Sequence, residues 1–260
     1  MAGFLLPFWG GLALASSDFL PVVLEDMNRV YQPAAESMRL RLETRVIHDS
    51  VSVVASAHRD KDLLWIEIHG GLLRSPRLSE DGLRFVLCHE LGHFFAGAPR
   101  KAHPFDSPEE SAPDGLSFFS AEGQSDYYAA SACFRRIVAG QDHGSFLGKA
   151  PVPPAVREKC ERTWGRLSAE SLVCQRTILA GLNMLLLVKD FPISVETPSE
   201  ERVERTNAFF YPSRQCRLDT AVAGALCRSS LPLLFDFNDP MAVRCGNAEG
   251  LRPRCWFKPD

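Results

Sequence analysis

Alternating polar and apolar residues mark the first third of the chain as a small sheet. Residues 39–46 alternate for most of their length, which is the period of a half-buried strand. Two more strand candidates, 51–57 and 63–69, are joined by a polar turn. Three strands in succession predict a small antiparallel meander over about 39–70. The pattern before it, over 18–38, predicts a helix broken or bent near Pro33.

Helical signals follow the predicted sheet. Ser79 can cap a helix whose first turn carries Glu80 and Asp81, and Gly97 followed by Pro99 ends it. Further helices are expected over about 120–139, from Pro154 onward, and from a Ser168 cap to about Lys189.

Two segments have no clear periodicity. The polar, proline-bearing stretch over about 100–114 is long for a connection, and we expect it to form a wall of a substrate cleft. Residues 190–260 are predicted to be loop-rich, because proline and cysteine interrupt them repeatedly.

Strands first and helices afterwards predict an α+β fold. We expect the small antiparallel sheet to pack on the helix that starts at Ser79, followed by a helical lobe and a disulfide-rich C-terminal region. At 260 residues the chain is most simply one domain over 16–260, with a β-rich part at about 39–70, a helical part at about 79–189 and a cysteine region at about 190–260.

Residues 1–15, MAGFLLPFWGGLALA, differ from the rest of the chain. They carry no charge, and they end in Ala13-Leu14-Ala15, a small-x-small cleavage pattern. The stretch resembles a secretory signal peptide, although no lysine or arginine precedes its apolar part. The longest other apolar run, 178–188, suits a buried helix, so no stable membrane insertion is expected. A net charge of −3 gives no reason to expect a nucleic-acid partner.

Eight cysteines favour the same exported location, periplasmic or secreted. No C-x-x-C pair is present, so a zinc ribbon or a thioredoxin-like motif is not supported. Short spacing favours Cys216–Cys227 and Cys245–Cys255 as disulfides. For Cys88 a buried free thiol and a bridge are equally open.

The stretch Cys88–Gly97, CHELGHFFAG, carries the chemistry. His89 and His93 are four residues apart, so in a helix they share one face and can hold one metal ion. A catalytic zinc site needs a third protein ligand and leaves a fourth position for water. Glu122 and Asp126 share a face of the next predicted helix: Glu122 could bind the metal, and Asp126 could hydrogen-bond the far nitrogen of His89.

HELGH followed by EGQSD resembles the gluzincin class of zinc metallopeptidases over residues 79–139, including the preceding strand at 64–69. The segments 211–213 and 216–220 are similar to parts of exported, cysteine-rich bacterial members. The resemblance implies one zinc ion held by His89, His93 and Glu122, Glu90 as general base towards a zinc-bound water, and Asp126 as the residue that orients a ligand. It also implies that the strand at 64–69 is an edge strand that pairs with the substrate.

Peptidases of this kind usually place a Tyr, His or Arg to stabilise the oxyanion. The candidates downstream of the ligand helix are Tyr211, Arg217, His143 and His103. The rival zincin pattern needs a third histidine where this chain has Pro99, which excludes it.

The leading hypothesis is therefore a zinc-dependent peptide-bond hydrolase that acts on a peptide or protein substrate. The alternatives are a catalytically inactive, disulfide-stapled binding or scaffold protein, and a zinc hydrolase for non-peptide amides. The intact Glu90 argues against a scaffold, which needs the metal ligands but not a base.

Overall fold

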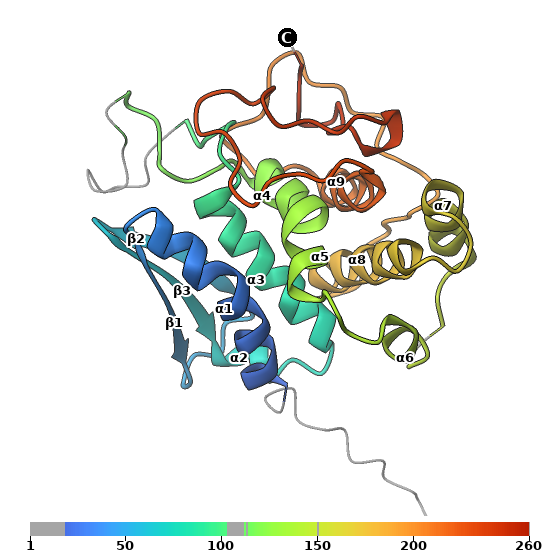
Figure 1. The fold of residues 1–260 in the computed structure, drawn as a ribbon, viewed down its shortest axis with the longest axis horizontal. Coiled ribbons are helices and arrows are strands. Elements are labelled where there is room, and N and C mark those ends of the chain that lie inside the picture. Colours follow the sequence, from blue (N-terminus) through green and yellow to red (C-terminus); the bar gives the residue numbers. More distant parts are fainter. Residues whose placement is uncertain (1–18, 103–111, 113, 150, 260) are drawn as a thin grey trace, which may run out of the picture.

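The structure is a computed structural model that describes residues 19–102, 112, 114–149 and 151–259. The predicted signal peptide over 1–15 and His103 lie outside the described residues, as does most of the predicted cleft loop. The α+β class is confirmed: a three-stranded sheet lies on one side, and a helical lobe lies on the other (Figure 1).

The sheet has the strand order β1-β3-β2, with β1 at Arg41–Ile47, β2 at Ala55–Asp60 and β3 at Leu63–His69. β2 and β3 are antiparallel, as the meander predicts. β1 runs parallel to β3, so the meander is wrong for this pair. The alternation of polar and apolar residues indicates which side chains of a strand are buried, but not which strand pairs with it. Residues 48–54 connect β1 to β2, and β3 lies between these two strands in the sheet.

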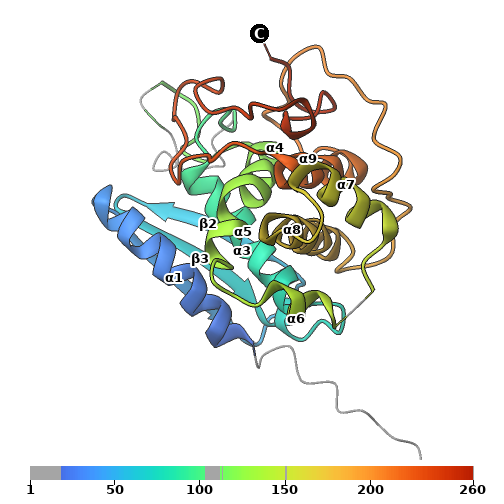
Figure 2. The ribbon, with the colours of Figure 1, turned by 45° about the vertical axis from the view of Figure 1, so that its right-hand side comes forward.

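One face of the sheet is covered by α1 (Leu20–Ser37) and α3 (Glu80–Phe95), as Figures 1 and 2 show. The alternate β3 residues Leu64, Ile66 and Ile68 are at most 1% exposed and face this layer. The helix predicted here is present and runs without a break through Pro33. Burial of these apolar side chains holds the sheet to α3, which carries the two histidines.

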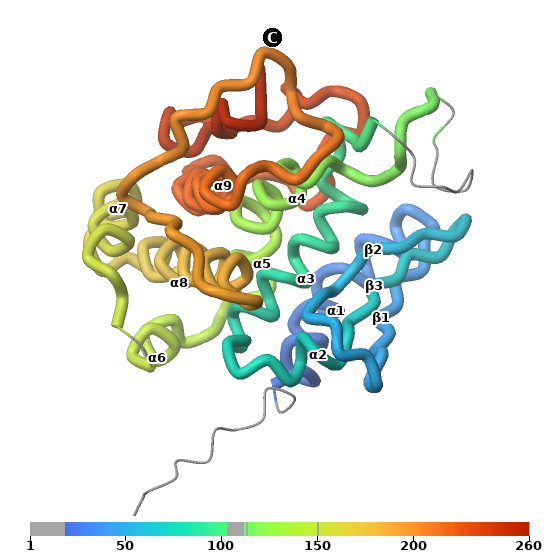
Figure 3. The backbone as a smooth tube through the Cα atoms, turned by 180° about the vertical axis from the view of Figure 1, so that it is seen from behind, coloured from blue at the N-terminus to red at the C-terminus, as the bar shows by residue number. Residues whose placement is uncertain are grey.

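The predicted start of α3 is confirmed, because the Ser79 hydroxyl accepts a hydrogen bond from the Gly82 N–H. α3 lies between the sheet and the helical lobe (Figure 3). Most of its side chains are therefore buried. The polar groups of α3 that reach this interior therefore need partners close by.

The helical lobe follows the sequence prediction closely. The helix expected over 120–139 is continuous, with a π-helical segment in its middle. Pro154 and Ser168 begin the next two long helices, as predicted. The elements of the lobe are α4 (Glu122–Tyr128), η2 (Ala129–Cys133), α5 (Phe134–Ile137), α7 (Pro154–Trp164) and α8 (Ala169–Leu185). Three short elements were not predicted: α2 (Gly70–Leu73), α6 (His143–Leu147) and η3 (Ala248–Gly250).

The prediction of a loop-rich C-terminal region is wrong for one segment, since Arg214–Leu226 forms the helix α9. The predicted pairs Cys216–Cys227 and Cys245–Cys255 are wrong, because Cys216 bridges Cys255 and Cys227 bridges Cys245. Cys216 and Cys227 stand at opposite ends of this rigid helix, roughly 16 Å apart at 1.5 Å per residue, too far for a bridge.

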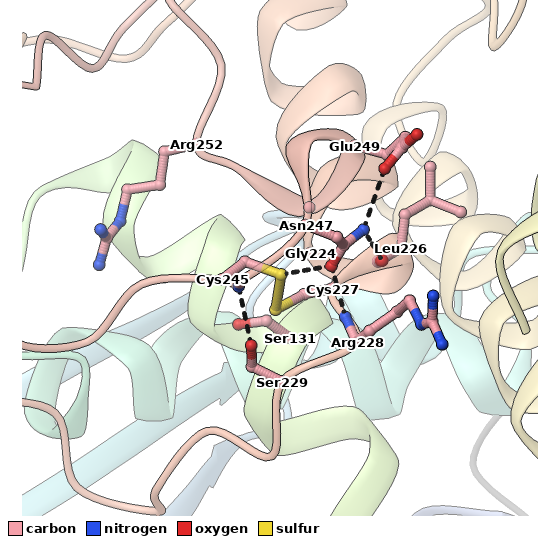
Figure 4. Close-up of a disulfide and its surroundings, with 12 residues drawn as sticks. Ser131, Gly224, Leu226, Cys227, Arg228, Ser229, Cys245, Asn247, Glu249 and Arg252 are labelled. Atoms are coloured by element: carbon pink, nitrogen blue, oxygen red, sulfur yellow. Dashed lines mark hydrogen bonds between the residues drawn. A yellow bond between two sulfur atoms is a disulfide. The ribbon is translucent and has the colours of Figure 1, made fainter.

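The four disulfides are Cys88–Cys133, Cys160–Cys174, Cys216–Cys255 and Cys227–Cys245. Figure 4 shows the last of these beside the segment that follows α9. Four buried bridges are typical of proteins that fold in an oxidising compartment. No helix in the described ranges is both long and apolar enough to span a bilayer.

Candidate metal centre

The structure brings His89, His93 and Glu122 together between α3 and α4. One ligand atom from each lies within 4.8 Å of the other two, and all three side chains are buried. The two histidines share a face of α3, with ring centroids 4.9 Å apart. Glu122 is the first residue of α4, which packs against that face. Two imidazoles and a carboxylate are a donor set that suits zinc.

The outer nitrogen of each imidazole is already bonded. The Nδ1 atom of His89 lies 2.8 Å from Oδ1 of Asp126, so the predicted hydrogen bond between these residues is present. The Nδ1 atom of His93 lies 2.9 Å from the Ser120 carbonyl oxygen, which can only accept. Nδ1 therefore carries the proton in a neutral His93, and Nε2 presents a lone pair towards Glu122.

The inner nitrogens of both imidazoles face the carboxylate of Glu122. The Nε2 atoms of His89 and His93 lie 3.2 Å and 3.7 Å from oxygens of Glu122. The Oε2 atom of Glu122 is buried and has no hydrogen-bond partner among the described residues. The His93 lone pair and the Glu122 carboxylate face one another, which is unfavourable in a buried site unless a cation, or a proton on Nε2 of His89, lies among them. The cluster can thus hold a metal ion, and its residues fit one.

The cluster also contains a cation of its own. The ammonium group of Lys101 lies 2.8 Å from Oε1 of Glu122. Two backbone hydrogen bonds hold the main chain of Lys101 in place. The Lys101 N–H donates to the Phe119 carbonyl, and the Ser117 N–H donates to the Lys101 carbonyl. Neither Lys101 nor the Ser120 carbonyl was predicted, because no spacing rule connects them to the histidine motif.

Burial and neighbouring charges set the protonation of the centre. Burial lowers the pKa of His93 to about 3, so this imidazole is neutral. Burial also disfavours charge on His89, but Asp126 outweighs it and the pKa rises to about 9. Burial disfavours a charged Glu122 too, yet the charged His89 imidazole and the Lys101 ammonium group hold its pKa well below the usual range.

Glu90 follows the first ligand on α3 and is only 7% exposed. Burial raises its pKa to about 7, opposed by the charge of His89 and reinforced by that of Glu122. A carboxyl group with this pKa can take up and release a proton near neutrality.

Two of the four oxyanion candidates lie at the centre. The Nε and Nη2 atoms of Arg217, on α9, donate to Oδ2 and Oδ1 of Asp126 at 2.7 Å and 2.8 Å. The Tyr211 ring lies 5.2 Å from this guanidinium. Partial burial and the nearby Glu122 carboxylate raise the pKa of Tyr211 above its ordinary value.

The other two candidates do not join them. His143 lies in α6, where its Nδ1 atom is 2.7 Å from Nη1 of Arg176, and it is not part of the cluster. Sequence order placed it after the ligand helix, but Arg176, its partner, binds Asp81 in the first turn of α3, whereas the two ligand histidines lie further along that helix. His103 lies outside the described residues.

The predicted edge strand also needs correction. β3, which contains residues 64–69, pairs on both sides and is the central strand. β2 pairs with β3 alone among the described strands, and so it supplies the edge beside α3. Three strand signals in a row gave no information about which strand would be central.

Comparison with known proteins finds no counterpart: no protein-family model matches the chain, and neither a curated protein nor a solved structure matches it significantly.

Proposed function

We propose that this protein is a zinc-dependent peptidase of gluzincin type, exported to the periplasm or secreted. The observation that carries the proposal is the buried cluster of His89, His93 and Glu122 with Glu90 beside it. A structural zinc site is usually closed by four protein ligands. Here the described residues supply three, and an acid with a pKa of about 7 stands next to them.

When bound by these three side chains, zinc would lower the pKa of a water molecule and polarise a scissile carbonyl group. Glu90 takes the proton of the attacking water and later donates it to the departing amine. Asp126 holds the His89 ring in place through Nδ1, and Arg217 in turn fixes both Asp126 oxygens. Tyr211 is the better oxyanion candidate, because the guanidinium of Arg217 is already engaged by Asp126.

The proposed substrate is a peptide or protein segment in extended conformation. The outer edge of β2 lies beside α3 and offers backbone groups for pairing with such a segment. Four disulfides support the exported location.

A second candidate function is an inactive scaffold that keeps the cluster without metal. The ion pair of Lys101 with Glu122 favours it, because the ammonium group already balances part of the buried negative charge. In that case the chain would bind little zinc, and Glu90 would have no metal-bound water molecule to activate.

The test is digestion of a mixed peptide library by the chain with one equivalent of zinc, with products identified by mass spectrometry. Glu90→Gln keeps the shape of the side chain but removes the base. We expect cleavage by the wild type, and a loss of at least about 100-fold in Glu90→Gln with zinc content unchanged.

The matched control is Glu158→Gln on the exposed surface of α7, which should cleave like the wild type. Little bound zinc together with no cleavage would favour the scaffold, and stoichiometric zinc without any cleavage would contradict the peptidase proposal. Equal cleavage by the wild type and Glu90→Gln would contradict the proposed role of Glu90.

A further inference from the structure

A cavity lies beside α4, which contributes Tyr127 to its wall. Its volume is about 430 Å³, within the range of small-molecule sites. Three arginines line it, Arg244, Arg252 and Arg254, and no aspartate or glutamate of the described chain does. None of the metal-centre residues contributes to its wall.

Arg252 is the unusual member, since it is a buried cation (7% exposed) without an anionic partner among the described residues. Its Nε atom donates to the Gln124 side chain, and its two Nη atoms donate to the carbonyl groups of Pro240 and Val243. All three acceptors are neutral, and they use three of the five guanidinium N–H groups. Burial lowers the pKa of Arg252 to about 10, since no carboxylate replaces the lost hydration.

The surroundings of Arg252 exclude an acid in the same segment as its counter-ion. Figure 4 shows Arg252 on one side of the Cys227–Cys245 disulfide and Glu249 on the other. Glu249 accepts a hydrogen bond from the Asn247 amide instead. A buried charge is normally paired, so the missing anion is the feature that a ligand would supply.

The rest of the wall is apolar. The guanidinium of Arg252 stands 5.0 Å and 4.9 Å from the ring centroids of Tyr127 and Phe257, and Met241 and Leu251 extend this surface. Arg244 and Arg254 are exposed and form no ion pair among the described residues. The cavity therefore combines three arginine side chains with an aromatic and aliphatic wall.

We propose that this cavity binds a small organic anion that has a carboxylate group and an apolar body. The carboxylate is held by the arginines, and the body packs on Tyr127 and Phe257. The inference does not depend on the proposed peptidase activity, because the two sites share no residue.

The probe is 3-phenylpropionate, titrated calorimetrically into the full chain in the presence of EDTA, so that the carboxylate cannot bind through a metal. Its neutral amide and inorganic phosphate are titrated in parallel. We expect saturable one-to-one binding of the carboxylate, at least tenfold tighter than either comparison compound and weaker at high salt.

Arg252 is buried, and its removal could prevent folding, so the variant of choice is Arg244→Gln/Arg254→Gln. It should bind the probe at least tenfold more weakly while melting at the wild-type temperature without ligand. Arg157→Gln/Arg166→Gln removes the same charge from exposed positions outside the cavity and should bind like the wild type. Absence of saturable binding, equal binding of the amide or of phosphate, or an unchanged double variant would each overturn the proposal.

Discussion

Lys101 places an ammonium group on a carboxylate that a metal ion also needs. Its Nζ atom is 2.8 Å from Oε1 of Glu122, and its side chain is 16% exposed, so solvent screens the pair only in part. Metal binding must displace this contact or share the oxygen with it. We expect Lys101→Met to raise the affinity for zinc about tenfold, or about 1.4 kcal/mol, measured by competition with a chromophoric chelator.

Lys189→Met, at an exposed position after α8, is the control and should bind zinc like the wild type. Weaker zinc binding by Lys101→Met would mean that the ammonium group supports the site rather than competing for it.

At the residue scale, side chains with a fixed spacing were predictable, and groups without one were not. Helical periodicity placed His89 and His93 on one face, and the need of a ligand histidine for a carboxylate partner predicted that Asp126 would bond His89. Lys101 and the Ser120 carbonyl reach the centre through a loop whose path depends on contacts distant in sequence. No local pattern encodes such a path.

At the element scale, the metal centre depends on how closely α3 approaches α4. A β-carbon at Gly92 would lie 2.8 Å from the Ser125 Cα and 3.0 Å from its carbonyl oxygen, which is closer than atoms pack. Gly92→Ala should therefore push the helices apart, separate the histidines from Glu122, and cost about 1–3 kcal/mol of unfolding free energy. Equilibrium denaturation and zinc titration of the same sample measure both effects.

Gly144→Ala in α6 is the matched control, because its nearest neighbour would lie 3.5 Å away. It should keep wild-type zinc affinity and stability. Wild-type zinc binding by Gly92→Ala would show that the two helices can part without disturbing the ligands.

Helices with a capping residue and a long apolar face were predictable, and α9 was not. Ser213 caps α9, since its hydroxyl accepts from the Cys216 N–H, so a start signal was present in the sequence. Its buried side chains, however, are mainly small ones such as Ala221, Ala223 and Ala225, which give a weak periodic pattern. The error matters, because α9 carries Arg217 to Asp126.

At the scale of the whole molecule, three segments far apart in the sequence complete one centre. α3 supplies the histidines, α4 supplies Glu122 and Asp126, and α9 supplies Arg217. The Cys216–Cys255 disulfide fixes the start of α9 immediately before Arg217. The Cys160–Cys174 disulfide joins α7 to α8, away from these side chains. The two bridges should therefore differ in their effect on the metal.

Loss of either disulfide should destabilise the fold through the entropy of the unfolded chain. For separations of 39 and 14 residues, the cost is about 4 and about 3 kcal/mol. Cys216→Ala/Cys255→Ala should also weaken zinc binding about tenfold, because a mobile Arg217 no longer holds Asp126 against His89. Cys160→Ala/Cys174→Ala should keep wild-type zinc affinity despite its lower melting temperature. If both variants lost zinc affinity in proportion to their stability, the centre would depend on overall stability, and Arg217 would have no separate positioning role.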